Sequence, residues 1–559
     1  MSTVGDWRAI VKSSLPTFVF TALLSVIVAV YIASADFGYH WDEHWHVDAV
    51  KNSVTTGVCL PNMFVYPSVV YDIGILSLLP HALGYYASGQ PEHGASLPQY
   101  LLRVASGRSF VLQWRVTLTV LSFLAALWTY LAVYRWREST WEAVLAGAFV
   151  CLSWEFGYHA RFIAVDALEA QFVALSILCT MMFLTGGRAD WLRAAGAVSG
   201  IAAGTKYPAL IAIVPAMLAV SVGPAQGRSA ARRLMLAGQA GLYCVLFFVV
   251  TTPGALLDLP LFVKHLSWMA SVNQSGWRMH TVQAGWTHFV LMLQYLGFAG
   301  LSFQPTVALA FAVLALWGVA VVVMREPRLA VVLLSIPVLY VAYFSRMQVM
   351  NARNLLLLLP IMAVFAARGL ADLMGMVARH STLRVGLALL VALGLSFNVW
   401  WAFETAFSIR NPDPAGYSRQ LVAFIAAHPR MHVALSDRLE RELSGSKRLG
   451  TASVVAEISG PDDAIAFYTS EVQSMLLYTA NKYNYAIAWF GSHEINFNYY
   501  PAWPNDTGRE YIVVMKVRDA LPLRLASRRM EQYRRRVGEG VRGGGQTVPG
   551  GARGDGSDM

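Results

Sequence analysis

Long apolar runs recur through the first 404 residues of this 559-residue chain, and they constrain the fold more than any other feature. A hydrocarbon core about 30 Å thick needs about 20 apolar residues in a helix, because each residue rises by about 1.5 Å. One run is interrupted at Lys206-Tyr207-Pro208 and is interpreted as two short helices. The sequence therefore predicts a polytopic α-helical membrane domain over 1–404 with about 11 transmembrane helices. The runs are 16–34, 111–134, 141–157, 166–186, 194–222, 234–252, 303–324, 329–345, 354–376 and 384–404.

The composition excludes several classes of protein. Hydrophobic residues make up 56% of the chain and charged residues 14%, against roughly 25% charged in ordinary soluble domains. A soluble enzyme, a disordered hub and a fibrous protein are therefore excluded, and four cysteines are too few for a disulfide scaffold. The net charge of +10 is scattered between apolar runs without a base-reading motif. It favours membrane orientation, and no nucleic-acid partner is expected.

The positions of Lys and Arg predict the orientation in the membrane. With the N-terminus inside, every inside loop is short and basic. This works only if 65–88 and 286–301 do not cross, so both are predicted to be juxtamembrane segments on the outer face. Pro67, Asp72 and Pro80 interrupt the first of them. The first span has no small-residue cleavage site and is interpreted as an uncleaved anchor. We expect a multi-pass protein of the cell inner (plasma) membrane.

The composition changes after the last apolar run. Charged and polar residues return, and Asn411-Pro412-Asp413-Pro414 indicates a linker. Residues 405–535 are predicted to form a small extracytoplasmic α/β domain, and the Gly- and Arg-rich segment 536–559 is predicted to be disordered. The expected strands are His432–Ser436, Tyr485–Phe490 and Glu510–Val517.

The polar clusters between the runs all fall on the outer face in this topology. The first contains Asp42 and Glu43, which would point about 100° apart on a helix and lie next to tryptophans suited to a membrane interface. Alternatively, the pair is a solvated helix start. A divalent metal site remains a third possibility, although the spacing fits no ligand template. Its ligands would be His40, Asp42, Glu43, His44 and His46.

Three further clusters contain candidate residues. Asp166 opens an apolar helix just after His159 and Arg161, where ionisable residues at membrane depth indicate a function and helix capping is the alternative. Lys206 lies at the helix break, where a snorkelling lysine is the alternative to a functional one. Arg346 and Arg353 lie on an outward loop, against the positive-inside trend, so an anion is expected there. That anion is either a lipid headgroup or a substrate phosphate.

The order of these features resembles the GT-C superfamily of integral-membrane glycosyltransferases. The nearest groups are the protein O-mannosyltransferase-like and aminoarabinose-transferase-like enzymes, and the resemblance covers about 1–404. Besides the clusters above, its motifs are Tyr66-Pro67, the stretch from Gly200 to Tyr207, and Thr252-Pro253-Gly254-Ala255-Leu256-Leu257-Asp258. Asn498-Tyr499-Tyr500-Pro501-Ala502-Trp503-Pro504 also resembles a motif of some bacterial members.

The resemblance implies inverting transfer of a hexose or pentose from a polyprenyl-phosphate donor to a glycan, lipid or protein acceptor. It assigns Asp42 as general base and Glu43 as its support or as a contact to the acceptor. Arg346, Arg353 and Lys206 would bind the donor phosphate, and no metal cofactor would be needed. Asp166, Arg161, His159 and Tyr66 would line the substrate site. Two other classes stay open, namely a transporter or flippase of a lipid-linked or anionic substrate and a non-catalytic membrane assembly protein.

Overall fold

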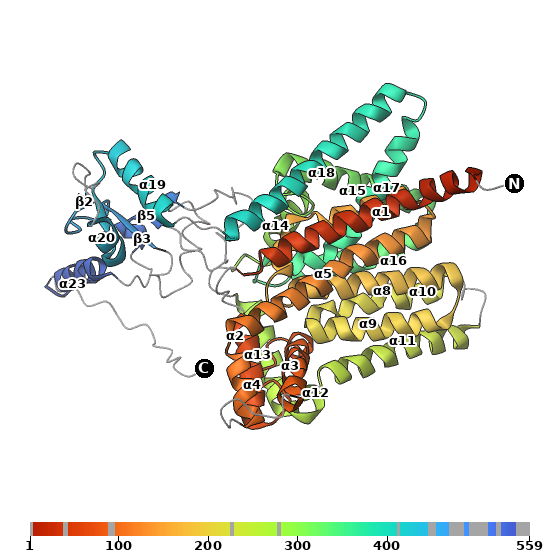
Figure 1. Ribbon diagram of the computed structural model, residues 1–559, viewed down its shortest axis with the longest axis horizontal. Helices are drawn as coiled ribbons and strands as arrows, with labels where there is room; N and C mark the ends of the chain where they lie inside the picture. Colours follow the sequence, from red (N-terminus) through yellow and green to blue (C-terminus); the bar gives the residue numbers. More distant parts are fainter. Residues whose placement is uncertain are drawn as a thin grey trace. The chain divides into compact units, whose positions relative to one another are not determined.

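The computed structural model consists of two compact units, which divide the chain near residue 411. It describes residues 4–36, 43–87, 96–223, 229–276, 281–410, 414–444, 454–468, 486–490, 512–520 and 527–543. The first unit is helical, and the second contains a mixed sheet (Figure 1). The predicted fold class, a polytopic helical membrane protein with a small C-terminal α/β domain, is confirmed.

Eight helices in the described part of the chain are long and apolar enough to cross a membrane. They lie at eight of the predicted span positions. They are α1 (Val4–Ala33), α5 (Arg108–Arg137), α8 (Asp166–Gly186), α11 (Ala230–Thr251), α15 (Pro305–Arg325), α16 (Pro327–Phe344), α17 (Leu359–Met376) with the 3-10 turn η4 (Ala352–Leu358) before it, and α18 (Ser381–Arg410).

The other three predicted spans are shorter helices. They are α6 (Thr140–Cys151), α9 (Ala189–Thr205), and the 3-10 turn η2 (Tyr207–Ala212) continued by α10 (Ile213–Val222). α9 ends just before Lys206, as the sequence predicts, because Pro208 lacks a backbone N–H and disfavours helical geometry at the residue before it.

The predicted juxtamembrane segments form helices that are not among the eight candidate spans. They are α3 (Val69–Ala87) and α14 (Trp286–Phe298). The remaining helices of this unit are α2 (Glu43–Thr56), α4 (Leu97–Ala105), α7 (Trp154–Ala160), α12 (Gly254–Leu257) and α13 (Leu259–Ser275). α2, α3, α4, α12 and α13 gather at one end of the helical unit (Figure 1). The side of the membrane on which this end lies remains a prediction.

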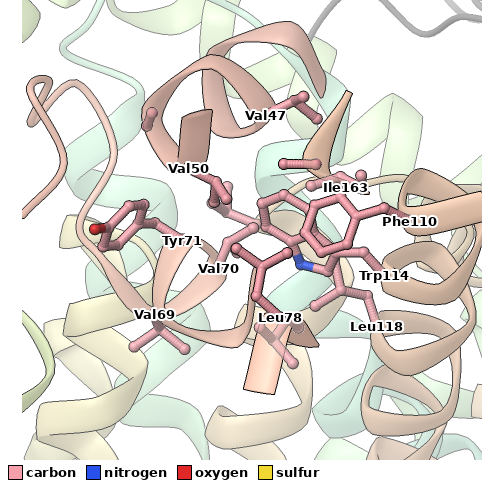
Figure 2. Packing of buried hydrophobic residues seen from close by; sticks show 14 residues of the cluster. Val47, Val50, Val69, Val70, Tyr71, Leu78, Phe110, Trp114, Leu118 and Ile163 are labelled. Carbon is pink, nitrogen blue, oxygen red and sulfur yellow. The ribbon is translucent and has the colours of Figure 1, made fainter. Parts of the chain in front are cut away.

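A cluster of buried apolar side chains joins α2 and α3 to the start of α5. Trp114 of α5 is fully buried, and its indole lies among Val50, Val70 and Phe110 (Figure 2). Gly74 of α3 faces this ring, and a Cβ at position 74 would collide with it. The cluster also includes Ile163, from the segment just before α8, so it fixes α2 close to that segment.

Ion pairs hold the far end of α5. Arg137 Nε lies 3.5 Å from Glu142 Oε2 of α6, and its Nη1 lies 3.3 Å from Glu326 Oε1 at the α15–α16 turn. Arg368 Nη1 of α17 lies 3.8 Å from the same Glu142 oxygen, and Trp136 Nε1 donates a hydrogen bond to Glu326. α5, α6, α17 and the α15–α16 turn are therefore joined at this end by charged side chains.

The second unit contains a five-stranded sheet in the order β2-β1-β3-β5-β4. β1 is parallel to β2 and β3, whereas β5 is antiparallel to β3 and β4. The three predicted strands are found as β1, β4 and β5, and α23 extends to Gly543, so the first part of the segment predicted to be disordered is helical. The strands are β1 (Val433–Leu435), β2 (Val454–Val455), β3 (Ala464–Tyr468), β4 (Ala486–Phe490) and β5 (Ile512–Lys516). The helices are α19 (Pro414–Ala427), α20 (Asp437–Ser444), α22 (Val517–Ala520) and α23 (Arg528–Gly543).

Candidate functional site

Three of the predicted site residues meet in one buried cluster of charges. Lys206 Nζ donates a 2.7 Å hydrogen bond to Asp166 Oδ1. The other oxygen of this carboxylate, Oδ2, lies 3.6 Å from Arg353 Nε. All three side chains are almost completely buried. The cluster therefore combines residues that are far apart in sequence, as the hypothesis of a shared site requires.

The local backbone explains this meeting. Asp166 is the first residue of α8, where a carboxylate is favoured by the helix dipole. Lys206 has an extended backbone between α9 and η2, so its side chain leaves the chain where the helix is interrupted. Arg353 belongs to η4, the turn that precedes α17. Each of the three side chains thus projects from a helix start, a helix break or a 3-10 turn, and the three meet there.

Two residues that the sequence analysis did not single out complete this cluster. Glu169 lies one turn after Asp166, and its Oε2 is 3.5 Å from Lys206 Nζ. Asn354 Oδ1 accepts a second 2.7 Å hydrogen bond from Lys206, and its backbone oxygen accepts a 2.6 Å bond from the Tyr340 hydroxyl. The spacing of Glu169 from Asp166 was a signal in the sequence, whereas nothing local distinguishes Asn354 from other loop asparagines.

Glu43 is bound inside the protein. Both of its carboxylate oxygens accept hydrogen bonds from Arg115 of α5, and Oε1 also accepts a 3.0 Å bond from the backbone N–H of Ile163. Arg115 also donates to the backbone oxygen of Ala35. The start of α2 is therefore tied to the segment only three residues before Asp166. This arrangement gives Glu43 an anchoring position, while its role in catalysis remains a prediction.

The candidate general base, Asp42, lies outside the described residues, and so does His40. His46 is buried, with its ring 5.7 Å from Tyr66 and 6.5 Å from Trp114 between centroids. Burial lowers the pKa of His46 to about 4, against the opposing influence of Asp166. Its imidazole is therefore neutral near pH 7. Among the described residues, no group of three or more His, Cys, Asp or Glu side chains is arranged to hold a metal ion.

The remaining predicted residues lie in different surroundings. Arg161 is fully buried, with its guanidinium 5.4 Å from the centroid of the Tyr158 ring, and it donates a 3.3 Å hydrogen bond to Ser34 Oγ. His159 Nε2 lies 3.2 Å from Glu155 Oε1. Arg346 is exposed on the turn after α16, unlike the buried Arg353. The two arginines that the sequence analysis grouped together therefore differ in surroundings.

Fold and cluster together define a multi-pass helical membrane protein with a buried charged centre at the start of α8. Residues 105–253 match the family model described as dolichyl-phosphate-mannose-protein mannosyltransferase. The matched segment contains Asp166 and Lys206, and it confirms the resemblance to this group of membrane glycosyltransferases. No curated protein matches the chain.

Two solved structures are similar over most of this chain. ArnT from Cupriavidus metallidurans bound to undecaprenyl phosphate is 13% identical with a TM-score of 0.47, and the match covers 90% of this chain and 98% of that one. The archaeal oligosaccharyltransferase AglB from Archaeoglobus fulgidus, in complex with an inhibitory peptide and a dolichol-phosphate, is 11% identical with a TM-score of 0.44. That match covers 78% of this chain and 64% of AglB.

Proposed function

We propose that this protein is an inverting glycosyltransferase that transfers a sugar from a polyprenyl-phosphate donor to an acceptor at the extracytoplasmic face. The observation that carries the proposal is the meeting of Asp166, Lys206 and Arg353 in one buried cluster. Buried cations beside a helix start are suited to an anion such as a lipid phosphate. The matched family, whose name specifies a lipid-phosphate sugar, supports the same donor class.

In the proposed reaction, Asp42 removes the proton from an acceptor hydroxyl. The acceptor oxygen then bonds to the anomeric carbon of the sugar from the face opposite the phosphate. The bond between that carbon and the phosphate oxygen breaks, and its electron pair stays on the lipid phosphate. Lys206 and Arg353 stabilise the released charge, so no divalent metal is needed for this step.

A transfer assay with purified protein in lipid vesicles tests the proposal. A radiolabelled polyprenyl-phosphate sugar is the donor, and a cell-envelope extract supplies glycan, lipid and protein acceptors. The expected result is label on an acceptor together with free polyprenyl phosphate, unchanged by a chelator. Label that stays lipid-linked but changes leaflet would identify a flippase instead. Loss of transfer with chelator would contradict the metal-free mechanism.

A further inference from the structure

Glu169 is a buried carboxylate whose bonding is incomplete. Its side chain is 1% exposed, and its Oε2 approaches Lys206 Nζ to 3.5 Å, longer than a good hydrogen bond. Oε1 is buried and has no hydrogen-bond partner among the described residues. A buried carboxylate oxygen without a donor is unfavourable, because it has lost its water without a replacement. The described contacts therefore hold the negative charge of Glu169 weakly.

The ammonium group of Lys206 has three N–H donors. Two of them are used in 2.7 Å hydrogen bonds to Asp166 and Asn354, and Glu169 is the third neighbour, at 3.5 Å. A phosphate oxygen that binds Lys206 must replace one of these acceptors. The contact with Glu169 is the longest, so it is the one whose loss costs least.

The charges of the cluster around Glu169 come from three parts of the fold. Lys206 comes from the α9–η2 junction, Arg353 from η4 and Asp166 from α8 itself. The Tyr340 hydroxyl of α16 also faces the two carboxylates. Two cations and two carboxylates balance in this cluster. An added phosphate makes the cluster negative unless one carboxylate becomes neutral, and this imbalance is costly away from water.

We propose that the phosphate of the polyprenyl lipid displaces Glu169 from Lys206, and that Glu169 takes up one proton from solvent in the same step. The inference rests on the proposed function, since it concerns the same phosphate site. One contact between a phosphate oxygen and Lys206 replaces the contact with Glu169 Oε2, and no covalent bond changes except the O–H formed on the carboxyl. Glu169 is thus a positioning residue that acts through Lys206 and makes donor binding depend on pH.

Binding of undecaprenyl phosphate, measured by calorimetry between pH 7.5 and 9, tests this proposal. The lipid phosphate remains a dianion in this range, because its second pKa is about 6. The imidazoles of His46 and His159 also face Asp166, and burial lowers the pKa of His46 to about 4, below this range. The same titration in two buffers of different ionisation enthalpy gives the number of protons taken up on binding, because the buffer supplies these protons. The wild-type protein should take up as much as one proton, and its Kd should rise by as much as tenfold per pH unit.

The Glu169→Gln variant should take up no proton, and its Kd should stay constant and be about tenfold lower than that of wild type at pH 9. Glu142→Gln is the matched control, because Glu142 is also buried between arginines. Arg135, two residues before its partner Arg137, donates a hydrogen bond to Thr185 near the far end of α8, about 30 Å from Asp166 along that helix. This control should keep the wild-type dependence on pH.

Binding by wild type without proton uptake would overturn the inference, and so would an unchanged pH dependence in Glu169→Gln. The wild-type measurement needs no variant, so the inference can be tested even if Glu169→Gln fails to fold. If wild type binds no lipid phosphate at any pH, the proposed function fails instead.

Discussion

Lys206 Nζ and Asp166 Oδ1 are joined by a 2.7 Å hydrogen bond across 40 residues of sequence. The bond connects the break after α9 with the first residue of α8. It converts two isolated polar positions, each explicable alone by snorkelling or capping, into a buried ion pair. Burial of such a pair is costly unless the charges are matched and hydrogen-bonded, and this cost is a reason to expect a function for it.

The two candidate arginines should contribute unequally to binding of the lipid phosphate. Arg353→Ala should weaken binding of undecaprenyl phosphate by about 10- to 100-fold and lower turnover as well, because hydrogen bonds to charged groups contribute about 1.5–3 kcal/mol. Arg346→Ala should change the affinity by less than about threefold, since Arg346 is exposed. Calorimetry on the purified variants measures both. The reverse ranking would move the phosphate contact to the turn after α16.

Replacement of Asp42 should affect catalysis, whereas replacement of the adjacent Glu43 should affect stability. Asp42→Asn should lower transfer by about 10²- to 10⁴-fold with donor binding intact, because only the general base is removed. Glu43→Gln should instead lower thermal stability, since it removes the negative charge from the buried pair of Glu43 with Arg115, at a cost of about 3–5 kcal/mol. Transfer assays and thermal unfolding in detergent separate the two effects. Full activity in Asp42→Asn would move the search for the base to Asp166.

Cysteine labelling should place the two ends of α5 on opposite sides of the membrane. Its 30 residues extend about 45 Å, longer than a hydrocarbon core of about 30 Å. With the exposed Cys59 replaced by Ser, an impermeant maleimide outside the cell should label Ser106→Cys and not Glu138→Cys. The opposite result would mean that α3 crosses the membrane and that the assigned sidedness is wrong.

The packing of α9 on α11 should depend on glycine. A Cβ at Gly200 would collide with the backbone oxygen of Cys244, so Gly200→Ala should destabilise the protein by about 1–3 kcal/mol. A Cβ at Gly238 of α11 would meet nothing within 4 Å. Gly238→Ala is therefore the control, and it should be neutral or stabilising by less than about 1 kcal/mol. Equal melting temperatures for the two variants would contradict the close helix approach.

The segment before α3 should loosen at acidic pH. Phe64 N–H donates a 3.0 Å hydrogen bond to Nδ1 of His265, which only a neutral form of the ring can accept. Burial, and then Lys264, hold the pKa of His265 below its usual value, against the opposing influence of Asp258. The contribution to stability is therefore present above about pH 6.5 and is lost as pH falls through the lowered pKa.

Hydrogen exchange at the Phe64 amide measures this effect. Protection, corrected for intrinsic exchange, should fall between pH 7 and pH 5 in the wild type. His265→Gln keeps a possible acceptor but does not titrate, so its protection should stay constant. A variant that loses protection in parallel with wild type would exclude His265 as the cause.

Local features of the fold could be predicted from the sequence, whereas contacts that depend on long-range packing could not. Apolar run length located the candidate spans, and Pro208 correctly located the end of α9, because both are local properties. Arg115 was hidden inside an apolar run, and its pairing with Glu43 depends on how α2 packs on α5. The contact between Lys206 and Asn354 likewise depends on long-range packing. The short strand β3, Ala464–Tyr468, was not predicted. Both of its faces are buried, so its sequence lacks the alternation of apolar and polar residues that identifies a half-buried strand.

The ion pairs of α5 also limit how this helix can move. Arg115 binds Glu43 near one end, and Arg137 binds Glu142 and Glu326 at the other. A roll about the helix axis, or a slide by one turn, would break ion pairs at both ends together. A single residue inserted between the two arginines would turn one end by about 100° relative to the other, so one anchor would always be lost. The position and rotation of α5 are thus fixed at both ends, and a movement that opens the helical unit must come from the helices around it.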